Sequence, residues 1–332
     1  MTRARTAVTD WSPESERKDP LAQFAADVEY YLTQQPRQLP SRYLYDGLGS
    51  ALFEAICRLP WYRITAAERQ LLTTYGDEVL QRASPISTMV ELGPGSGEKI
   101  RRLLERRPPG AEPCDVHLID VSPTALELSS RTLASVERVR VWTHQTRYET
   151  GLAEVTRDLA ADERVLVLFL GSNIGNFDPP GTDAFLGSIR SQLRAGDALL
   201  VGADLVKPEP ELLAAYDDPL GVTAAFNRNL LVRINRELGG DFDLDHFAHR
   251  AVWNAAESRI EMHLVARRAQ AVQVRAAGIA FAMAEGESIW TESSYKYRRR
   301  DIADLLGAAG FRPTGQWLDR EARFALTLAE AV

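Results

Sequence analysis

The chain has 332 residues, of which 45% are hydrophobic and 26% are charged, a globular composition that excludes a disordered or collagen-like protein. Its formal net charge of −7, from 39 Lys and Arg against 46 Asp and Glu, disfavours a nucleic-acid partner. Two cysteines are too few for a disulfide framework or a cysteine-rich metal site. There is neither a membrane-spanning apolar run nor a signal peptide, so we expect a soluble, cytoplasmic protein with no membrane partner.

The first part of the chain predicts helices. Residues 1–20 are polar and mixed in charge, and we expect them to be flexible. Thr65, followed three residues later by Glu68, has the spacing of a capping box and predicts the start of a helix. Apolar residues at helical spacing predict helices over residues 19–35, 49–58 and 65–80.

Strands and helices alternate between residues 88 and 206. The run 165–170 is apolar throughout, as in a strand that is buried on both faces. The alternation predicts a parallel sheet with helices on both faces. The predicted strands are 88–92, 116–120, 139–142, 165–170 and 198–201, and the helical patterns lie at 98–106, from 122 onward, and at 185–193.

The alternation stops at residues 207–210, which include two prolines. A helical region over 211–239 follows, and then strand-like runs at 249–254, 259–267 and 271–275. A last helix at 300–309 and strand-like residues near 311 and at 324–328 are expected to complete the first sheet. We therefore predict an α/β fold with a Rossmann-like core and a second, inserted α+β domain.

A glycine-rich loop joins the first predicted strand of the alternating region to its helix. Gly93, Gly95 and Gly97 allow a tight turn and a close approach of the backbone to a ligand. The dinucleotide fingerprint would require a further glycine where this chain has Glu98. Glu91 would repel a pyrophosphate and attract an ammonium group. These features disfavour a nicotinamide-dependent oxidoreductase.

Asp120 ends the second predicted strand, 23 residues after Gly97. A carboxylate at this place can accept hydrogen bonds from both hydroxyls of a ribose. Enzymes that bind NAD share the feature, so Asp120 alone does not identify the ligand. A purely structural loop and a helix-capping acid are the alternatives.

The spacing Glu-x-Gly-x-Gly-x-Gly resembles motif I of the class I methyltransferases, which bind S-adenosylmethionine. The resemblance implies that Glu91 lies near the methionine end of this cofactor. Lys99, just past the loop, is either a partner of the cofactor's carboxylate or a solvated lysine. The predicted cofactor site thus contains Glu91, Gly93, Gly95, Gly97, Lys99 and Asp120.

Eight further segments, in order between about Arg42 and Leu328, carry a more specific resemblance. They resemble the histidine Nα-methyltransferases, which make trimethylhistidine (hercynine) for ergothioneine biosynthesis. The segments are 45–53, 58–62, 169–177, 202–207, 215–218, 226–229, 261–262 and 291–297.

This resemblance implies which residues hold the backbone groups of the substrate. Asn176 and Tyr216 would bind the α-amino and carboxylate groups, and Tyr45 would line the pocket near the reacting amine. Asn176 and Tyr45 are therefore the predicted catalytic residues. An orienting amide is sufficient for this chemistry, because an α-amino group titrates near ~8 and is partly neutral without a strong base.

The same resemblance implies the residues that recognise the side chain. Glu292 and Ser294 would bind the imidazole, Tyr62 would lie near the same ring, and Met262 would pack beside it. The family has an acid before an aromatic residue near the adenine, where this chain has Arg147 and Tyr148. Tyr148 is therefore assigned to the cofactor site, whereas Arg147 has no acceptor for an adenine amino group.

The family's fold also implies domain boundaries. We expect a substrate-binding domain over residues 21–65 and 207–297, and a methyltransferase core over residues 66–206 and 298–332.

We predict an S-adenosylmethionine-dependent N-methyltransferase that acts on the α-amino group of L-histidine, and we expect a monomer with a small amino acid as its only partner. One alternative is an N-methyltransferase for another amino acid or aromatic amine such as tryptophan, which Trp61 and Trp290, beside the pocket motifs, leave open. Another is a cofactor-binding protein without catalysis. The five histidines have no metal-ligand spacing, so no metal is expected.

Overall fold

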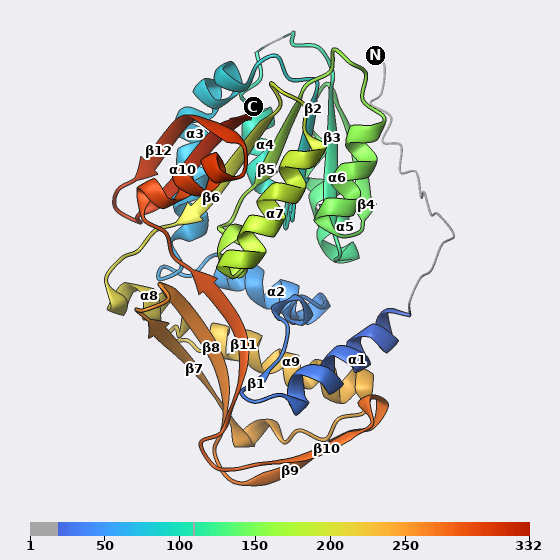
Figure 1. Ribbon diagram of the computed structural model, residues 1–332, viewed down its shortest axis with the longest axis vertical. Helices are drawn as coiled ribbons and strands as arrows, with labels where there is room; N and C mark the ends of the chain where they lie inside the picture. Colours follow the sequence, from blue (N-terminus) through green and yellow to red (C-terminus); the bar gives the residue numbers. More distant parts are fainter. Residues whose placement is uncertain (1–18, 109) are drawn as a thin grey trace. The chain divides into compact units, whose positions relative to one another are not determined.

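The computed structural model describes residues 19–108 and 110–332 (Figure 1). The expectation of a flexible segment over residues 1–20 falls almost wholly outside this part. The described residues form two compact units. The core unit comprises Arg63–Val206 and Tyr295–Val332, and the second unit comprises residues 19–62 and Lys207–Ser294.

The core unit contains a seven-stranded sheet in the order β12-β13-β6-β5-β2-β3-β4. The five parallel strands can be counted in chain order from β2 to β6. Followed from the β4 edge of the sheet, they are the third, second, first, fourth and fifth strands, which is the doubly wound order. Strands β13 and β12 extend the sheet in antiparallel orientation. The predicted Rossmann-like fold is confirmed. The strands are β2 (Thr88–Leu92), β3 (Cys114–Asp120), β4 (Val139–Gln145), β5 (Val165–Phe169), β6 (Ala198–Asp204), β12 (Phe311–Asp319) and β13 (Phe324–Ala331).

Helices cover both faces of this sheet (Figure 1). The apolar cluster on one face takes side chains from α6, α7 and α10, while α4 packs against α3 and α5. Strands β5 and β6 are buried along their whole length, which explains their uninterrupted apolar sequence. The helices are α3 (Ile64–Ala83), α4 (Glu98–Leu104), α5 (Pro123–Leu133), α6 (Tyr148–Arg157), α7 (Pro179–Gln192) and α10 (Arg299–Ala308), with the short 3₁₀ turn η2 (Asn173–Asn176) after β5.

The second unit is built around a four-stranded sheet in the order β1-β11-β8-β7 and a hairpin of β9 and β10. Helix α9 packs against β7, β8 and α2. The strands are β1 (Arg37–Gln38), β7 (Phe247–Asn254), β8 (Arg259–Ala266), β9 (Gln270–Val274), β10 (Ile279–Met283) and β11 (Ser288–Tyr295). The helices are α1 (Pro20–Thr33), α2 (Gly47–Ile56), α8 (Glu209–Tyr216) and α9 (Val222–Leu238), with 3₁₀ turns η1 (Ser41–Leu44), η3 (Leu244–His246) and η4 (Arg275–Ala277).

One local prediction is wrong. Thr65 is not an N-cap, because α3 already begins at Ile64 and its N-cap residue is Arg63. The prediction that residues 211–239 are mainly helical is confirmed, and the region consists of two helices, α8 and α9. The Asp218 carboxylate, in the turn between them, accepts hydrogen bonds from the backbone N–H of Leu220 and from those of Val222 and Thr223 at the start of α9, the last at 2.7 Å. Helix α6 was not predicted at all.

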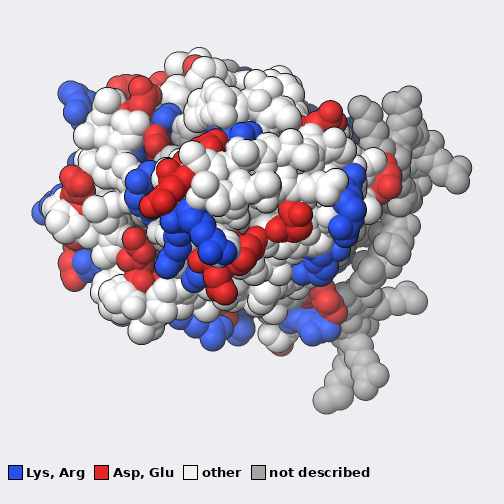
Figure 2. Space-filling model, turned by 90° about the horizontal axis from the view of Figure 1, so that it is seen from below, with Lys and Arg blue, Asp and Glu red and all other residues white. Residues whose placement is uncertain are grey.

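On the face shown in Figure 2, basic and acidic side chains are interspersed, and neither sign forms a continuous field. Within residues 19–108 and 110–332, no helix is long and apolar enough to cross a membrane. The same residues contain no group of three or more His, Cys, Asp or Glu side chains that could hold a metal ion.

Candidate functional site

The glycine loop lies at the carboxyl end of β2, beside β5, where the strand order of the sheet reverses. Ligands of open α/β sheets bind in the crevice at this switch point. Gly93 and Gly97 both have φ of 74°, and Gly95 has φ of 54°. A Cβ on Gly93 would lie 2.7 Å from the Tyr148 hydroxyl, and one on Gly97 would lie 2.9 Å from Ser129 Cα. The backbone conformation and the lack of space both require glycine at these two positions.

Glu91, near the end of β2, is a deeply buried acid of the core unit. The residue is 1% exposed, and neither carboxylate oxygen has a hydrogen-bond partner among the described residues. Burial raises its pKa to about 8; attraction to Lys99 opposes this shift, and repulsion from Glu68 and Asp120 adds to it. An orphaned buried carboxylate is costly unless a ligand supplies a donor. The α-ammonium group of an amino-acid-like cofactor fits this requirement.

Lys99 is held beside the same end of the sheet by a long-range contact. Its Nζ lies 2.7 Å from Oε2 of Glu68, a carboxylate that is fully buried. Glu68 also accepts a hydrogen bond from the Gly171 N–H, at 2.9 Å, just after β5. Glu68 therefore ties α3, α4 and the β5 loop together, a role that its spacing from Thr65 did not suggest. The pairing of Lys99 with a cofactor carboxylate remains a prediction.

Asp120 and Tyr148 lie near each other beside the loop. Asp120 ends β3, and its Oδ1 accepts a hydrogen bond of 2.8 Å from the Ser122 N–H. Burial raises the pKa of Asp120, while the backbone N–H groups of Ser122 and Val121 oppose this shift. Burial also raises the pKa of Tyr148, and the proximity of Asp120 adds to the shift. Tyr148 begins α6, and its ring packs on Phe169 at 5.9 Å between centroids.

We expect Asp120→Asn to weaken binding of S-adenosylmethionine by about 5–30-fold, because the amide keeps one acceptor but loses the second for a ribose hydroxyl. The retained oxygen can still accept from the Ser122 N–H, so the turn should persist. Isothermal calorimetry measures the effect. Unchanged affinity would exclude Asp120 from the ribose site.

Asn176 lies in η2, directly after β5, and its side chain is exposed. Two features fix this turn. Ser172 adopts a left-handed conformation with φ of 61°, and a Cβ on Gly175 would lie 2.7 Å from the backbone oxygen of Tyr295. Phe177, the next residue, stacks on Phe185 at 4.8 Å. The turn thus presents Asn176 at the carboxyl edge of the sheet, on the same edge as the glycine loop.

The second unit brings together the tyrosines singled out from the sequence. The Tyr216 hydroxyl lies 2.8 Å from the Ser294 hydroxyl, and the rings of Tyr62 and Tyr216 meet edge to face at 6.2 Å. Burial raises the pKa of Tyr62, and the neighbouring Tyr216, Tyr45 and Glu292 raise it further. These five side chains therefore share one neighbourhood.

Aromatic residues surround Tyr45 in this cluster. Its ring meets those of Phe53 and Phe226 at 5.5 Å each. Neither phenylalanine received a role from the sequence, although both lie in the motifs quoted above. Met262 is 1% exposed on β8, and its carbonyl lies 3.0 Å from the hydroxyl of Thr291, the residue before Glu292. The binding roles predicted for these residues remain predictions.

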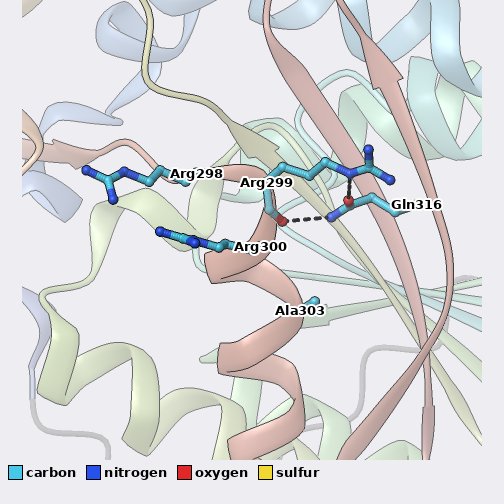
Figure 3. A pocket seen from close by; sticks show the side chains of 5 residues that line it. All are labelled: Arg298, Arg299, Arg300, Ala303 and Gln316. Atoms are coloured by element: carbon cyan, nitrogen blue, oxygen red, sulfur yellow. Dashed lines mark hydrogen bonds between the residues drawn. The ribbon is translucent and has the colours of Figure 1, made fainter.

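The arginine run Arg298–Arg300 lines a surface pocket of the core unit, together with Ala303 and Gln316 (Figure 3). All three arginines are exposed. Arg299 Nε donates to Gln316 Oε1 at 2.7 Å, and Gln316 Nε2 donates to the Arg299 carbonyl at 3.1 Å. These contacts join the start of α10 to β12.

The sheet order, the glycine loop and the orphaned acid define a class I methyltransferase core. The comparison with known families makes the assignment specific. A family of histidine-specific, S-adenosylmethionine-dependent methyltransferases matches residues 24–331, and the chain belongs to this family. The predicted cofactor and enzyme class are confirmed.

Curated relatives agree with this assignment. The chain is 41% identical to a histidine N-alpha-methyltransferase of Mycolicibacterium smegmatis, over 91% of this chain and 93% of that protein. It is 42% identical to the histidine N-alpha-methyltransferase of Mycobacterium tuberculosis, with the same coverage. It is also 27% identical to ergothioneine biosynthesis protein 1 of Neurospora crassa, over 85% of this chain and 32% of that longer protein.

Proposed function

We propose that the enzyme transfers methyl groups from S-adenosylmethionine to the α-amino nitrogen of L-histidine, forming the trimethyl product hercynine for ergothioneine biosynthesis. The observation that carries the proposal is the polar and aromatic cluster of the second unit, in which Glu292 and Ser294 lie beside Tyr62 and Tyr216. The names of the two mycobacterial relatives and the fungal relative support the substrate and the pathway.

The cofactor, when bound, supplies an activated methyl group on a sulfonium, so the task of the protein is positioning and electrostatics. Glu91 would accept from the cofactor's ammonium group and Asp120 from its ribose. The bound amine must be neutral to attack, and Asn176 would orient its lone pair through the side-chain oxygen. Tyr45 or a water molecule would pass on the proton that the ammonium group must lose before each attack.

The aromatic cluster also suits a product of growing positive charge. A quaternary ammonium has no N–H to donate, so recognition by hydrogen bonds fails at the last step. Rings such as that of Tyr45, which is packed against Phe53 and Phe226, attract such a cation through their faces. This favours the trimethyl product over a single methylation.

A time course with L-histidine and excess S-adenosylmethionine tests the number of methyl groups. Mass spectrometry should show one-, two- and three-methyl species in succession, ending with the trimethyl compound. Accumulation of a one- or two-methyl product that does not react further would contradict the proposal.

We expect Tyr216→Phe to raise the KM of every accepted amino acid by about 5–20-fold, because the hydroxyl that is proposed to bind the substrate's backbone groups, and that pairs with Ser294, is lost. Histamine, which lacks the carboxylate, should be a poor substrate of the parent enzyme. Steady-state kinetics with histidine and histamine measure both effects. Equal turnover of histamine and histidine would show that the enzyme does not bind the substrate's carboxylate.

A further inference from the structure

A buried hydrogen-bond network lies behind the proposed substrate residues. Its centre is Asn227 on α9, which is fully buried. Asn227 Oδ1 accepts a hydrogen bond of 2.6 Å from the Thr291 hydroxyl. Its Nδ2 lies 2.9 Å from His249 Nδ1 and donates to the His263 carbonyl at 3.2 Å. The amide therefore joins α9 to β7, β8 and β11.

The partners of His249 define its protonation. Its Nε2 lies 2.8 Å from the backbone oxygen of Tyr216, which can only accept, so Nε2 must hold the proton. Its Nδ1 then accepts from the Asn227 amide. Both nitrogens are satisfied only in this neutral tautomer, and the side chain is 1% exposed. The imidazole thus fixes the backbone of the residue whose hydroxyl meets Ser294.

The charged groups around His249 act in opposite directions. Burial lowers its pKa, and Arg228 on α9 adds to this shift. Asp217 and Asp218, in the turn after α8, oppose it, with Asp217 Oδ1 at 3.9 Å from Nε2. On β8, the neighbouring His263 also has a pKa lowered by burial. The balance favours the neutral ring that the geometry requires.

Thr291 connects the network to side-chain recognition. It is 1% exposed, and its hydroxyl reaches both Asn227 Oδ1 and, at 3.0 Å, the Met262 carbonyl. It directly precedes Glu292 on β11. A displacement of Thr291 would therefore move Glu292 and, three residues along, Ser294.

We propose that Asn227, His249 and Thr291 form a positioning triad that sets the geometry of the amino-acid pocket. His249 holds Tyr216, and Thr291 holds the strand segment that bears Glu292 and Ser294. The inference rests on the proposed function, because it takes these residues as the substrate contacts. The Asn227 amide and both His249 nitrogens find their partners within this network, so the loss of one member strands the others.

The test compares Thr291→Val with Thr291→Ser. Valine has the same shape but no hydroxyl, so Asn227 Oδ1 loses its donor. Thr291→Val should raise the KM for histidine by about 10-fold, because the pocket residues are no longer held in place. Its kcat should change by less than about threefold, and its affinity for S-adenosylmethionine should stay that of the parent. Thr291→Ser should restore the parent KM.

Thr327→Val is the matched control. Thr327 is fully buried on β13 of the core unit, and its hydroxyl accepts from Gln316 Nε2 at 3.0 Å. The control loses a buried hydroxyl but touches no proposed substrate residue. It should lower the melting temperature and leave the KM unchanged. Equal KM in Thr291→Val and parent, or an equal rise in both valine variants, would overturn the proposal.

The state of His249 provides a readout that needs no substrate. Nitrogen-15 NMR of the parent protein should show a neutral imidazole with the proton on Nε2 between pH 6 and 8. A proton on Nδ1, or an ordinary titration near neutral pH, would contradict the triad. If histidine is not methylated, the proposed function fails, while this NMR result and the KM comparison with whichever amino acid is accepted still decide the triad.

Discussion

Replacing Glu292 by alanine is expected to lower kcat/KM for L-histidine by about 10–100-fold, equivalent to roughly 1.4–2.8 kcal/mol. The proposed carboxylate acceptor for the imidazole N–H is removed from a pocket whose other groups are aromatic rings and hydroxyls. Turnover of tryptophan or phenylalanine should rise relative to histidine, because an apolar ring has no N–H to donate to the half-buried Glu292 carboxylate and this disadvantage disappears in the alanine variant.

Competitive methylation of a histidine–tryptophan mixture measures this change. Glu292→Gln is the control, because its amide oxygen can still accept from the imidazole N–H, and it should retain more histidine activity than the alanine variant. A product ratio that is the same in parent and Glu292→Ala would place Glu292 outside the pocket.

The second large effect is expected at Glu91. Its pKa of about 8 in the folded protein is higher than the usual value of 4.5, so the carboxyl group takes up a proton on folding. The stability that it contributes is present below the unfolded pKa and is lost as the pH rises from 4.5 to about 8. At pH 7 the parent protein must take up this proton in order to fold, which costs free energy, whereas glutamine is neutral in both the folded and the unfolded state. Glu91→Gln should therefore raise the free energy of unfolding at pH 7 by about 3 kcal/mol.

The same change should weaken binding of S-adenosylmethionine by about 10–100-fold, because a neutral amide attracts an ammonium group far less than a carboxylate does. Urea unfolding at pH 5 and pH 8 and calorimetry measure the two effects. The stability gain should grow with pH. Glu98→Gln, at an exposed residue just past the loop, is the control and should change neither quantity. Unchanged affinity of Glu91→Gln for S-adenosylmethionine would show that Glu91 does not bind the cofactor's ammonium group.

The parts of the fold that the sequence predicted are those with a local signal. The switch from helical spacing to short apolar runs located the strands of the core sheet, and the glycine spacing located the loop. Glu91 was also found from its place in that motif. Each of these depends on residues within a few positions of one another, and spacing reports such relations.

The features that were not predicted depend on contacts between residues that are far apart in the sequence. Helix α6 has Gly151 near its centre, which weakens any helical signal. The glycine is required because a Cβ there would lie 2.7 Å from Ile119 on β3. Likewise, Glu68 binds Gly171, which is 103 residues away, and does not cap α3. The partners of Asn227 lie on three strands, so the motif that contains Asn227 could not predict its role in positioning His249 and Thr291.

The α-amino group of L-histidine is the proposed methyl acceptor, and one reaction tests this proposal most directly. The parent enzyme is incubated with S-adenosylmethionine labelled in the methyl group and an equimolar mixture of the twenty amino acids. Mass spectrometry and NMR then identify every labelled product. We expect label on the α-nitrogen of histidine alone. Label on another amino acid or on an imidazole nitrogen, or the absence of labelled histidine, would contradict it.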